Sequence, residues 1–162
     1  MGLFSFLTEA GSKLGGKIHD VTHNDMDATA QITPGQINDA RANSIIANIN
    51  ESGVEVADLA VTVDSDKVSL KGRVSTQACS EKLTLISGNQ FGIGSVDCQL
   101  EVANPEPEAT FYIVKSDDDL SKIAKEFYGN ASKYPVIFEA NRPMLTNPNK
   151  IFVGQSLRIP AN

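Results

Sequence analysis

The sequence predicts an α+β protein of two small domains, and three observations lead to this fold class. Residues 104–109 form a short segment in which two prolines and two glutamates interrupt the apolar pattern of the 162-residue chain. Seven of the ten aromatic residues follow that segment. Charge changes there too: residues 36–103 hold nine acidic and five basic side chains, whereas residues 110–162 hold five acidic and seven basic ones. A proline-rich break between two such different compositions favours two separate cores joined by a linker at 104–109.

The first unit, residues 36–103, begins with a helix followed by a hairpin. Apolar residues spaced by three and four after Gln36 predict a helix that ends near Gly53. Apolar and polar residues then alternate from position 59 to 63 and again from 68 to 74. The acidic tripeptide between these two runs supplies turn chemistry, so the pattern predicts two antiparallel strands.

A second helix and a third strand complete this unit. Thr76 can cap a helix that carries Cys79, Leu83 and Ile86 on one face, and the glycines from position 88 onward end it. Residues 96–102 then alternate cleanly, which predicts a strand with Cys98 on its buried face. The predicted order is helix, strand, strand, helix, strand.

That order, with Gly-Ile-Gly-Ser-Val at 92–96 leading into the last strand, resembles the BON domain family. The resemblance covers residues 36–103 and implies an αββαβ fold.

The second unit, residues 110–162, has a sharper signature. The chain shows Y-x-V from Tyr112, then D-x-L-x-x-I-A, I-x-x-A-N and G-Q-x-L-x-I-P, which ends at Pro160. These motifs predict a strand, a helix started by carboxylates and ended by Gly129, a second short helix and a closing strand. They resemble the LysM family, with its βααβ fold. One departure is Asp117, which stands where the family places a glycine that lets a sugar approach the backbone.

The N-terminal segment, residues 1–35, carries an apolar stripe at positions 3, 4, 6, 7, 10 and 14. This spacing predicts an amphipathic helix that packs on the BON-like unit. Adhesion to a membrane surface through Phe4 and Phe6 is an alternative, although a net charge of -6 would be repelled by anionic lipid.

Composition excludes several other classes of function. No apolar run approaches the roughly 18 residues needed to cross a bilayer, and no basic residue precedes the short apolar stretch at the N-terminus, so we expect a cytoplasmic protein without stable membrane insertion. The acidic balance disfavours nucleic acid. Two cysteines, Cys79 and Cys98, are too few for a disulfide scaffold and are expected to be free thiols.

Catalytic and transition-metal motifs are lacking in the sequence. It contains neither G-x-S-x-G nor G-x-x-x-x-G-K, and its only histidines, His19 and His23, have no third imidazole or thiolate nearby to complete a zinc site. The residues that follow Asp64 and Asp66 lack the glycine and the terminal glutamate of a calcium-binding loop. Asp64-Ser65-Asp66 is therefore expected to form a turn. We therefore expect a protein that is not an enzyme.

A glycine-rich turn, residues 88–95, follows the second helix of the BON-like unit. A helix end leaves carbonyl oxygens without intrahelical partners, and a plain C-cap explains much of this pattern. The functional alternative is that these carbonyls, with those near Leu7, Ala10 and Gly11, surround a large monovalent cation. Uncharged carbonyls suit potassium, whereas magnesium and zinc prefer charged oxygen, imidazole or thiolate ligands.

The whole arrangement, from Met-Gly-Leu-Phe to G-Q-x-L-x-I-P, resembles a family of bacterial cytoplasmic potassium-binding proteins. This resemblance implies a potassium sensor or buffer whose ion site lies in the BON-like unit and the N-terminal segment, and whose LysM-like unit closes against that site when the ion binds. An unidentified protein partner is left open. It also implies a set of backbone carbonyl ligands, namely those of Leu7, Ala10, Gly11, Gln90, Gly92 and Ile93. The alternative is a module that binds peptidoglycan or N-acetylglucosamine through its LysM unit.

Overall fold

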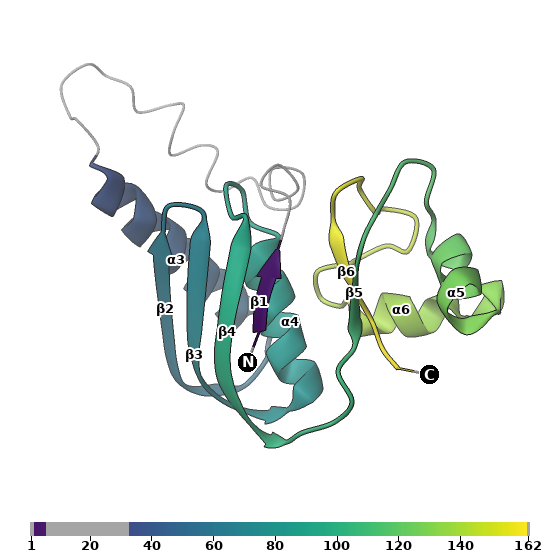
Figure 1. The fold of residues 1–162 in the computed structure, drawn as a ribbon, viewed down its shortest axis with the longest axis horizontal. Coiled ribbons are helices and arrows are strands. Elements are labelled where there is room, and N and C mark those ends of the chain that lie inside the picture. The colour runs from purple at the N-terminus through teal and green to yellow at the C-terminus, as the bar shows by residue number, and fades with distance from the viewer. Residues whose placement is uncertain (1, 6–32, 162) are drawn as a thin grey trace.

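The computed structural model describes residues 2–5 and 33–161, which adopt the predicted α+β fold (Figure 1). A four-stranded sheet in the order β1-β4-β3-β2 is followed by a two-stranded sheet, β5-β6. The elements are β1 (Gly2–Ser5), α3 (Pro34–Glu51), β2 (Val56–Asp64), β3 (Lys67–Thr76), α4 (Gln77–Gly88), β4 (Ser95–Asn104), β5 (Thr110–Ile113), α5 (Leu120–Tyr128), η1 (Ala131–Lys133), α6 (Tyr134–Ala140) and β6 (Ser156–Ile159).

Helix α3 starts two residues before the predicted position, for a local reason. The Thr33 hydroxyl accepts a hydrogen bond from the Gln36 backbone N–H (3.3 Å), and the Gln36 side chain accepts one from the Thr33 N–H (2.9 Å). This reciprocal capping box satisfies two backbone donors, and Pro34 fits the first turn because it has no N–H to leave unpaired. Ile45 and Ile49 on the inner face of the helix are completely buried.

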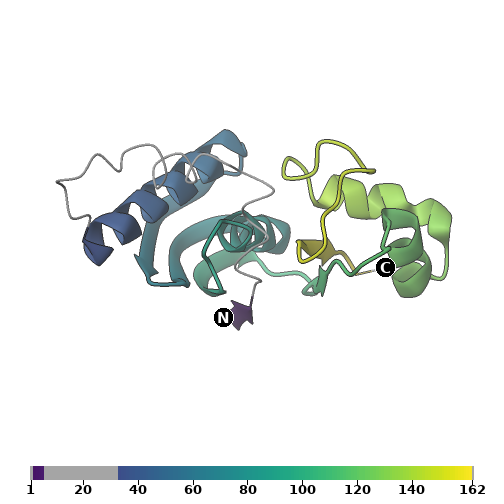
Figure 2. The ribbon, with the colours of Figure 1, turned by 90° about the horizontal axis from the view of Figure 1, so that it is seen from above.

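The first sheet combines the predicted hairpin with a parallel crossover. Strands β2 and β3 pair antiparallel across the turn at Asp64–Lys67, whereas β3 and β4 pair in parallel with Leu70 opposite Cys98. A parallel pair needs a long connection, which α4 provides. Thr76 caps α4 as predicted, by accepting a hydrogen bond from the Cys79 N–H. Helices α3 and α4 cover one face of this sheet (Figure 2), where side chains of β3, β4 and both helices form a single core.

The N-terminus does not begin as the helix that we predicted. Gly2–Ser5 form strand β1, which pairs antiparallel with β4 at the edge of the sheet. A short apolar run cannot be assigned to helix or strand from its period alone, and the unpaired backbone groups of β4 offer a partner that the local pattern does not reveal.

The second unit follows the predicted βααβ order, with a short 3-10 turn, η1, before α6. Asp119 caps α5 by accepting from the Lys122 N–H, and Gly129 ends that helix with a left-handed φ of 69°. Its core gathers apolar side chains of both helices and of β6. Phe127, near the end of α5, is 36% exposed and packs edge-on against Tyr112.

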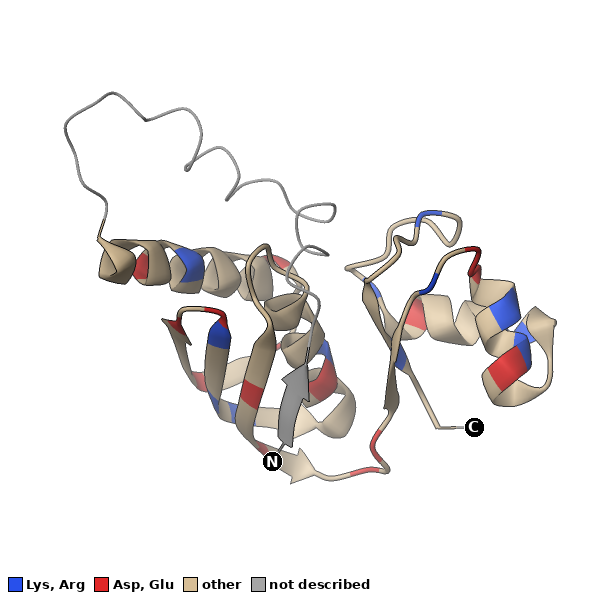
Figure 3. Ribbon diagram, turned by 45° about the horizontal axis from the view of Figure 1, so that its top comes forward, with Lys and Arg blue, Asp and Glu red and all other residues tan. Residues whose placement is uncertain are grey.

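The two units touch through more than their linker. Met144, after α6, packs against both cores. Asn104, expected in the linker, is the last residue of β4, and Ala109 at the other end of the predicted linker is buried. Figure 3 shows acidic and basic residues mixed along the described elements of both units, so no described element carries a long basic run that would suit a phosphate backbone.

Candidate functional site

The loop between α4 and β4 is the best-defined part of the predicted cation site. Helix α4 ends at Gly88, as predicted, and the Asn89 N–H still donates to the Leu85 carbonyl (2.9 Å). The chain then turns through Gly92, whose φ of 78° lies in the left-handed region that glycine adopts without a steric penalty. Strand β4 begins three residues later, at Ser95.

Several contacts hold this loop in one conformation. The Ile93 side chain is completely buried in the first core, and the Gln90 side-chain amide donates to the Ile86 carbonyl (2.8 Å) at the end of α4. The backbone N–H groups of Gly94 and Ser95 both donate to the Asp66 carbonyl, at 2.8 and 3.1 Å. The loop is therefore fastened to α4, to the core and to the β2–β3 turn, and its carbonyls have little freedom to reorient.

Three of the six predicted ligands, Gln90, Gly92 and Ile93, lie together in this loop. The Gln90 carbonyl accepts from the Ile93 N–H (3.2 Å), but a carbonyl oxygen has a second lone pair that remains available. Among residues 2–5 and 33–161, no hydrogen bond is made to the carbonyls of Gly92 and Ile93. The loop thus offers uncharged oxygen acceptors.

The other three predicted ligands, Leu7, Ala10 and Gly11, lie outside the described residues. The structure does define where the chain leaves β1. Ser5, the last residue of that strand, is opposite Ser95, the first residue of β4. Strand β1 therefore ends beside the end of β4 that the 88–94 loop enters.

A guanidinium group lies against the loop. Arg41, on α3, donates through Nη1 to the Ser65 carbonyl in the β2–β3 turn. Its Nη2 lies 2.7 Å from the point where a Cβ at Gly92 would stand, so any larger residue there would have to displace the guanidinium. No local pattern predicts this contact, because Arg41 and Gly92 are 51 positions apart.

The donor set of the loop fits a large monovalent cation better than a divalent one. Within the described part of the chain, no group of three or more histidine, cysteine, aspartate or glutamate side chains could hold a metal ion. Backbone carbonyls without carboxylates suit potassium, which keeps a loose shell of neutral oxygens. His19 and His23 lie outside the described residues.

The acidic sequences singled out earlier have structural roles. Asp64-Ser65-Asp66 forms the β2–β3 turn, as predicted. Asp118 accepts from the Tyr112 hydroxyl and from the Lys115 N–H, both at 2.8 Å. Burial, followed by the hydrogen bond to Asp118 and its charge, raises the pKa of Tyr112 to about 12. Cys79 and Cys98 are free thiols, as predicted, and Cys98 is buried.

The loop is also connected to the second unit, through residues that the sequence did not single out. Asn89, beside Gln90, bonds to the backbone of Ser156 on β6 in both directions. About two turns earlier on α4, the buried Glu81 carboxylate pairs with Arg158 of β6 and accepts from the Ala109 N–H (2.8 Å). The local sequence carries no signal for this interface, because Glu81 lies off the predicted apolar face of Cys79, Leu83 and Ile86 and resembles an exposed charge.

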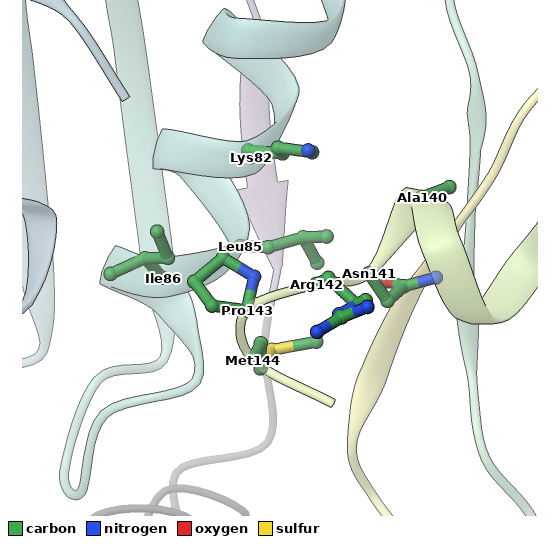
Figure 4. A pocket seen from close by; sticks show the side chains of 8 residues that line it. All are labelled: Lys82, Leu85, Ile86, Ala140, Asn141, Arg142, Pro143 and Met144. Carbon is green, nitrogen blue, oxygen red and sulfur yellow. The ribbon is translucent and has the colours of Figure 1, made fainter. Parts of the chain in front are cut away.

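Figure 4 shows a pocket between the units, lined by Lys82, Leu85 and Ile86 of α4 and by residues 140–144 at the end of α6 and just after it. This pocket has a volume of about 10 Å³, which is room for a water molecule and not for a sugar ring or a nucleotide. The units therefore contact each other closely here. As for membranes, none of the described helices combines the length and the apolar character that a bilayer-spanning segment needs.

Comparison with known proteins gives three matches. A family model for the LysM domain matches residues 112–160. Over 161 residues the chain is 40% identical to the Potassium binding protein Kbp of Escherichia coli O6:H1, a match that covers 99% of each protein. It is also 30% identical, over 141 residues, to an uncharacterized protein of Deinococcus radiodurans; that match covers 84% of this chain and 54% of the other protein.

Proposed function

The chain belongs to the family of the potassium binding protein Kbp, and from this membership we propose that it binds potassium ions. The observation that carries the proposal is the 40% identity over 99% of both chains, which leaves no domain of either protein unmatched. The E. coli relative is named for binding an ion rather than for a reaction, and we propose binding without catalysis here too.

We propose that the ligands are the backbone carbonyls of Leu7, Ala10, Gly11, Gln90, Gly92 and Ile93. The register of β1 supports this set, because Ser5 and Ser95 are opposite each other. Leu7 follows Ser5 by two residues and Ile93 precedes Ser95 by two, and two residues span only about 7 Å of chain. The two halves of the ligand set can therefore meet at the same end of β4.

The chemistry of these ligands defines what the site would select. Carbonyl oxygens replace the hydration shell of potassium, and a loop fastened by the core and by the Asp66 carbonyl holds them at fixed spacing. A smaller ion such as lithium or sodium gains less from oxygens that cannot close around it. We propose a site that prefers potassium over both.

We further propose that ion binding changes how the two units are placed. Asn89 is adjacent to the ligand Gln90 and is bonded to Ser156 of β6, so a shift in the loop would reach the second unit directly. Such a protein would act as a cytoplasmic potassium sensor or buffer, and its changed surface would be recognised by a protein partner. The BON family remains our proposal for residues 36–103.

A glycan-binding module is the second candidate, because the LysM family model matches residues 112–160. Asp117 stands where the family places glycine and has the left-handed φ of 66° that suits a glycine. Its carboxylate adds bulk and charge at a position where a sugar would approach the backbone. Co-sedimentation with insoluble peptidoglycan tests this candidate: saturable binding that chitin fragments compete would favour it over ion sensing.

Thermal unfolding in different chloride salts tests the proposal. A ligand that binds only the folded state adds RT ln(1 + [L]/Kd) to stability, which is about 2.7 kcal/mol at a hundredfold excess over Kd. At constant ionic strength, potassium should raise the melting temperature more than sodium, and lithium should raise it least. Equal melting curves in potassium and sodium would contradict the proposal.

A further inference from the structure

Arg41 places a positive charge beside the loop that carries three of the proposed ligands. Its guanidinium bridges from α3 to the β2–β3 turn by donating to the Ser65 carbonyl, and it lies against the backbone at Gly92. The space that a side chain at position 92 would need is thus filled by a cationic group of the protein itself.

The guanidinium is incompletely satisfied in this position. Its Nε is buried and finds no hydrogen-bond acceptor among the described residues. Within the same residues, Arg41 forms no salt bridge with a carboxylate, although Arg73 and Arg158 both do. A guanidinium has five N–H donors, and among the described residues those of Arg41 have one acceptor, the Ser65 carbonyl, so its charge is not neutralised there by an ion pair.

The N–H donors and the positive charge of Arg41 both matter for a neighbouring cation site. Arginine N–H groups and potassium ions use the same acceptors, neutral carbonyl oxygens, and the guanidinium lies against the backbone at Gly92, in the loop that supplies such oxygens. Two like charges a few ångströms apart repel each other strongly where water is partly excluded. A fixed guanidinium and a bound potassium ion would therefore oppose each other.

We infer that Arg41 sets the affinity of the proposed potassium site, as a tethered cation that weakens ion binding through charge repulsion. This inference rests on the proposed function. It makes Arg41 a residue that determines affinity without being an ion ligand. Its consequence is that the site would respond to higher potassium concentrations than the carbonyls alone would allow.

Calorimetric titration of the full chain with KCl, at an ionic strength held constant with choline chloride, tests the inference. Arg41→Gln keeps hydrogen-bonding capacity but removes the charge, and it should lower the Kd for potassium about tenfold, the size expected for unit charges at short range in a partly exposed site. Arg41→Lys keeps the charge and should leave the Kd within about threefold of the wild-type value.

Arg73→Gln is the matched control, because it removes the same charge from an exposed ion pair with Asp58. It should leave the Kd for potassium within about twofold, since exposed charges at a distance are screened. A lower Kd in Arg73→Gln equal to that in Arg41→Gln would assign the effect to net charge and overturn the inference.

An unchanged or higher Kd in a folded Arg41→Gln protein would also overturn the inference, because it would mean that Arg41 only supports the loop. If circular dichroism shows that Arg41→Gln is unfolded, Arg41→Met, of similar length and without charge, gives the same comparison. A wild-type protein that releases no heat with potassium would refute the proposed function itself. If the wild-type protein binds potassium but neither Arg41→Gln nor Arg41→Met binds it more tightly, only the role of Arg41 is refuted.

Discussion

The side-chain amide of Asn89 and the backbone of Ser156 form two hydrogen bonds, one in each direction and each 3.1 Å long. Asn89 is the C-cap of α4 and is followed by the proposed ligand Gln90, whereas Ser156 begins β6 of the LysM unit. Both residues are almost completely buried. One side chain therefore joins the proposed ion-binding loop to the second unit.

Replacement of Asn89 by alanine should destabilise the protein by about 2–3 kcal/mol, because it leaves a buried N–H and a buried C=O of Ser156 without partners. Urea denaturation measures this change. Asn104→Ala is the control: Asn104 is exposed, and its side chain makes one hydrogen bond within the described residues, to the Ser75 carbonyl, so its loss should cost under about 1 kcal/mol. Equal effects of the two substitutions would show that the Asn89 contact is not formed in solution.

Loss of the Glu81–Arg158 ion pair should destabilise the protein more than loss of the Asn89 contact. Glu81 is 3% exposed, and its removal would leave a guanidinium that is 11% exposed without a counter-charge. Glu81→Ala should lower the free energy of unfolding by about 3–5 kcal/mol. Asp58→Asn breaks an ion pair of the same kind whose side chains are 72% and 64% exposed, with a residue that tolerates the left-handed φ of 54° at this position, and it should cost under about 1 kcal/mol. A small effect of Glu81→Ala would mean that the two units do not dock as described.

Gly92 can be tested against a glycine with the same backbone conformation. Gly92 and Gly53 both have a left-handed φ, of 78° and 70°, but a Cβ at Gly53 would meet nothing within 4 Å. Gly53→Ala should therefore cost only the left-handed penalty, about 1–2 kcal/mol. Gly92→Ala should cost about 2 kcal/mol more, because it displaces Arg41 from the Ser65 carbonyl. Similar losses in the two variants would contradict this contact.

The raised pKa of Tyr112 predicts that the stability of the protein falls at high pH. Burial and the neighbouring Asp118 raise its pKa to about 12 from 10.0, so the folded state favours the neutral phenol. The contribution of this group is complete below pH 10 and is lost as the pH rises through 12. The stability advantage of the wild type over Tyr112→Phe should shrink across this range in denaturation experiments.

Ultraviolet titration of tyrosinate gives an independent measurement of the same group. Asp118→Asn removes the charge and the anionic acceptor, and it should lower the ionisation midpoint of Tyr112. A midpoint that does not move would exclude Asp118 as a cause of the raised pKa.

Most of the fold was predictable because its signals are local. Each of these signals depends on residues within one element. They are the alternation on either side of Asp64–Asp66, the helix caps at Thr76 and Asp119, and the helix end at Gly129. Strand β1 was not predictable in this way, since its pairing with β4 depends on an edge that exists only after the sheet has formed.

The candidate site was predictable only in part, for a chemical reason. Backbone carbonyls leave no mark on the side-chain sequence, so the loop at 88–95 was visible through its glycines and not through its ligands. Arg41 and Glu81 act through contacts with residues more than 20 positions away, and nothing in the neighbouring sequence distinguishes them from exposed charges.

Selective binding of potassium is the central claim, and calorimetry of the full chain tests it most directly. Titration with KCl, at constant ionic strength, should give a saturable heat that is weaker with NaCl and weakest with LiCl, and Gly92→Pro should abolish it because proline cannot adopt the positive φ of this loop. Identical heats for potassium and sodium, or unchanged potassium binding in a Gly92→Pro protein with native circular dichroism, would contradict the account.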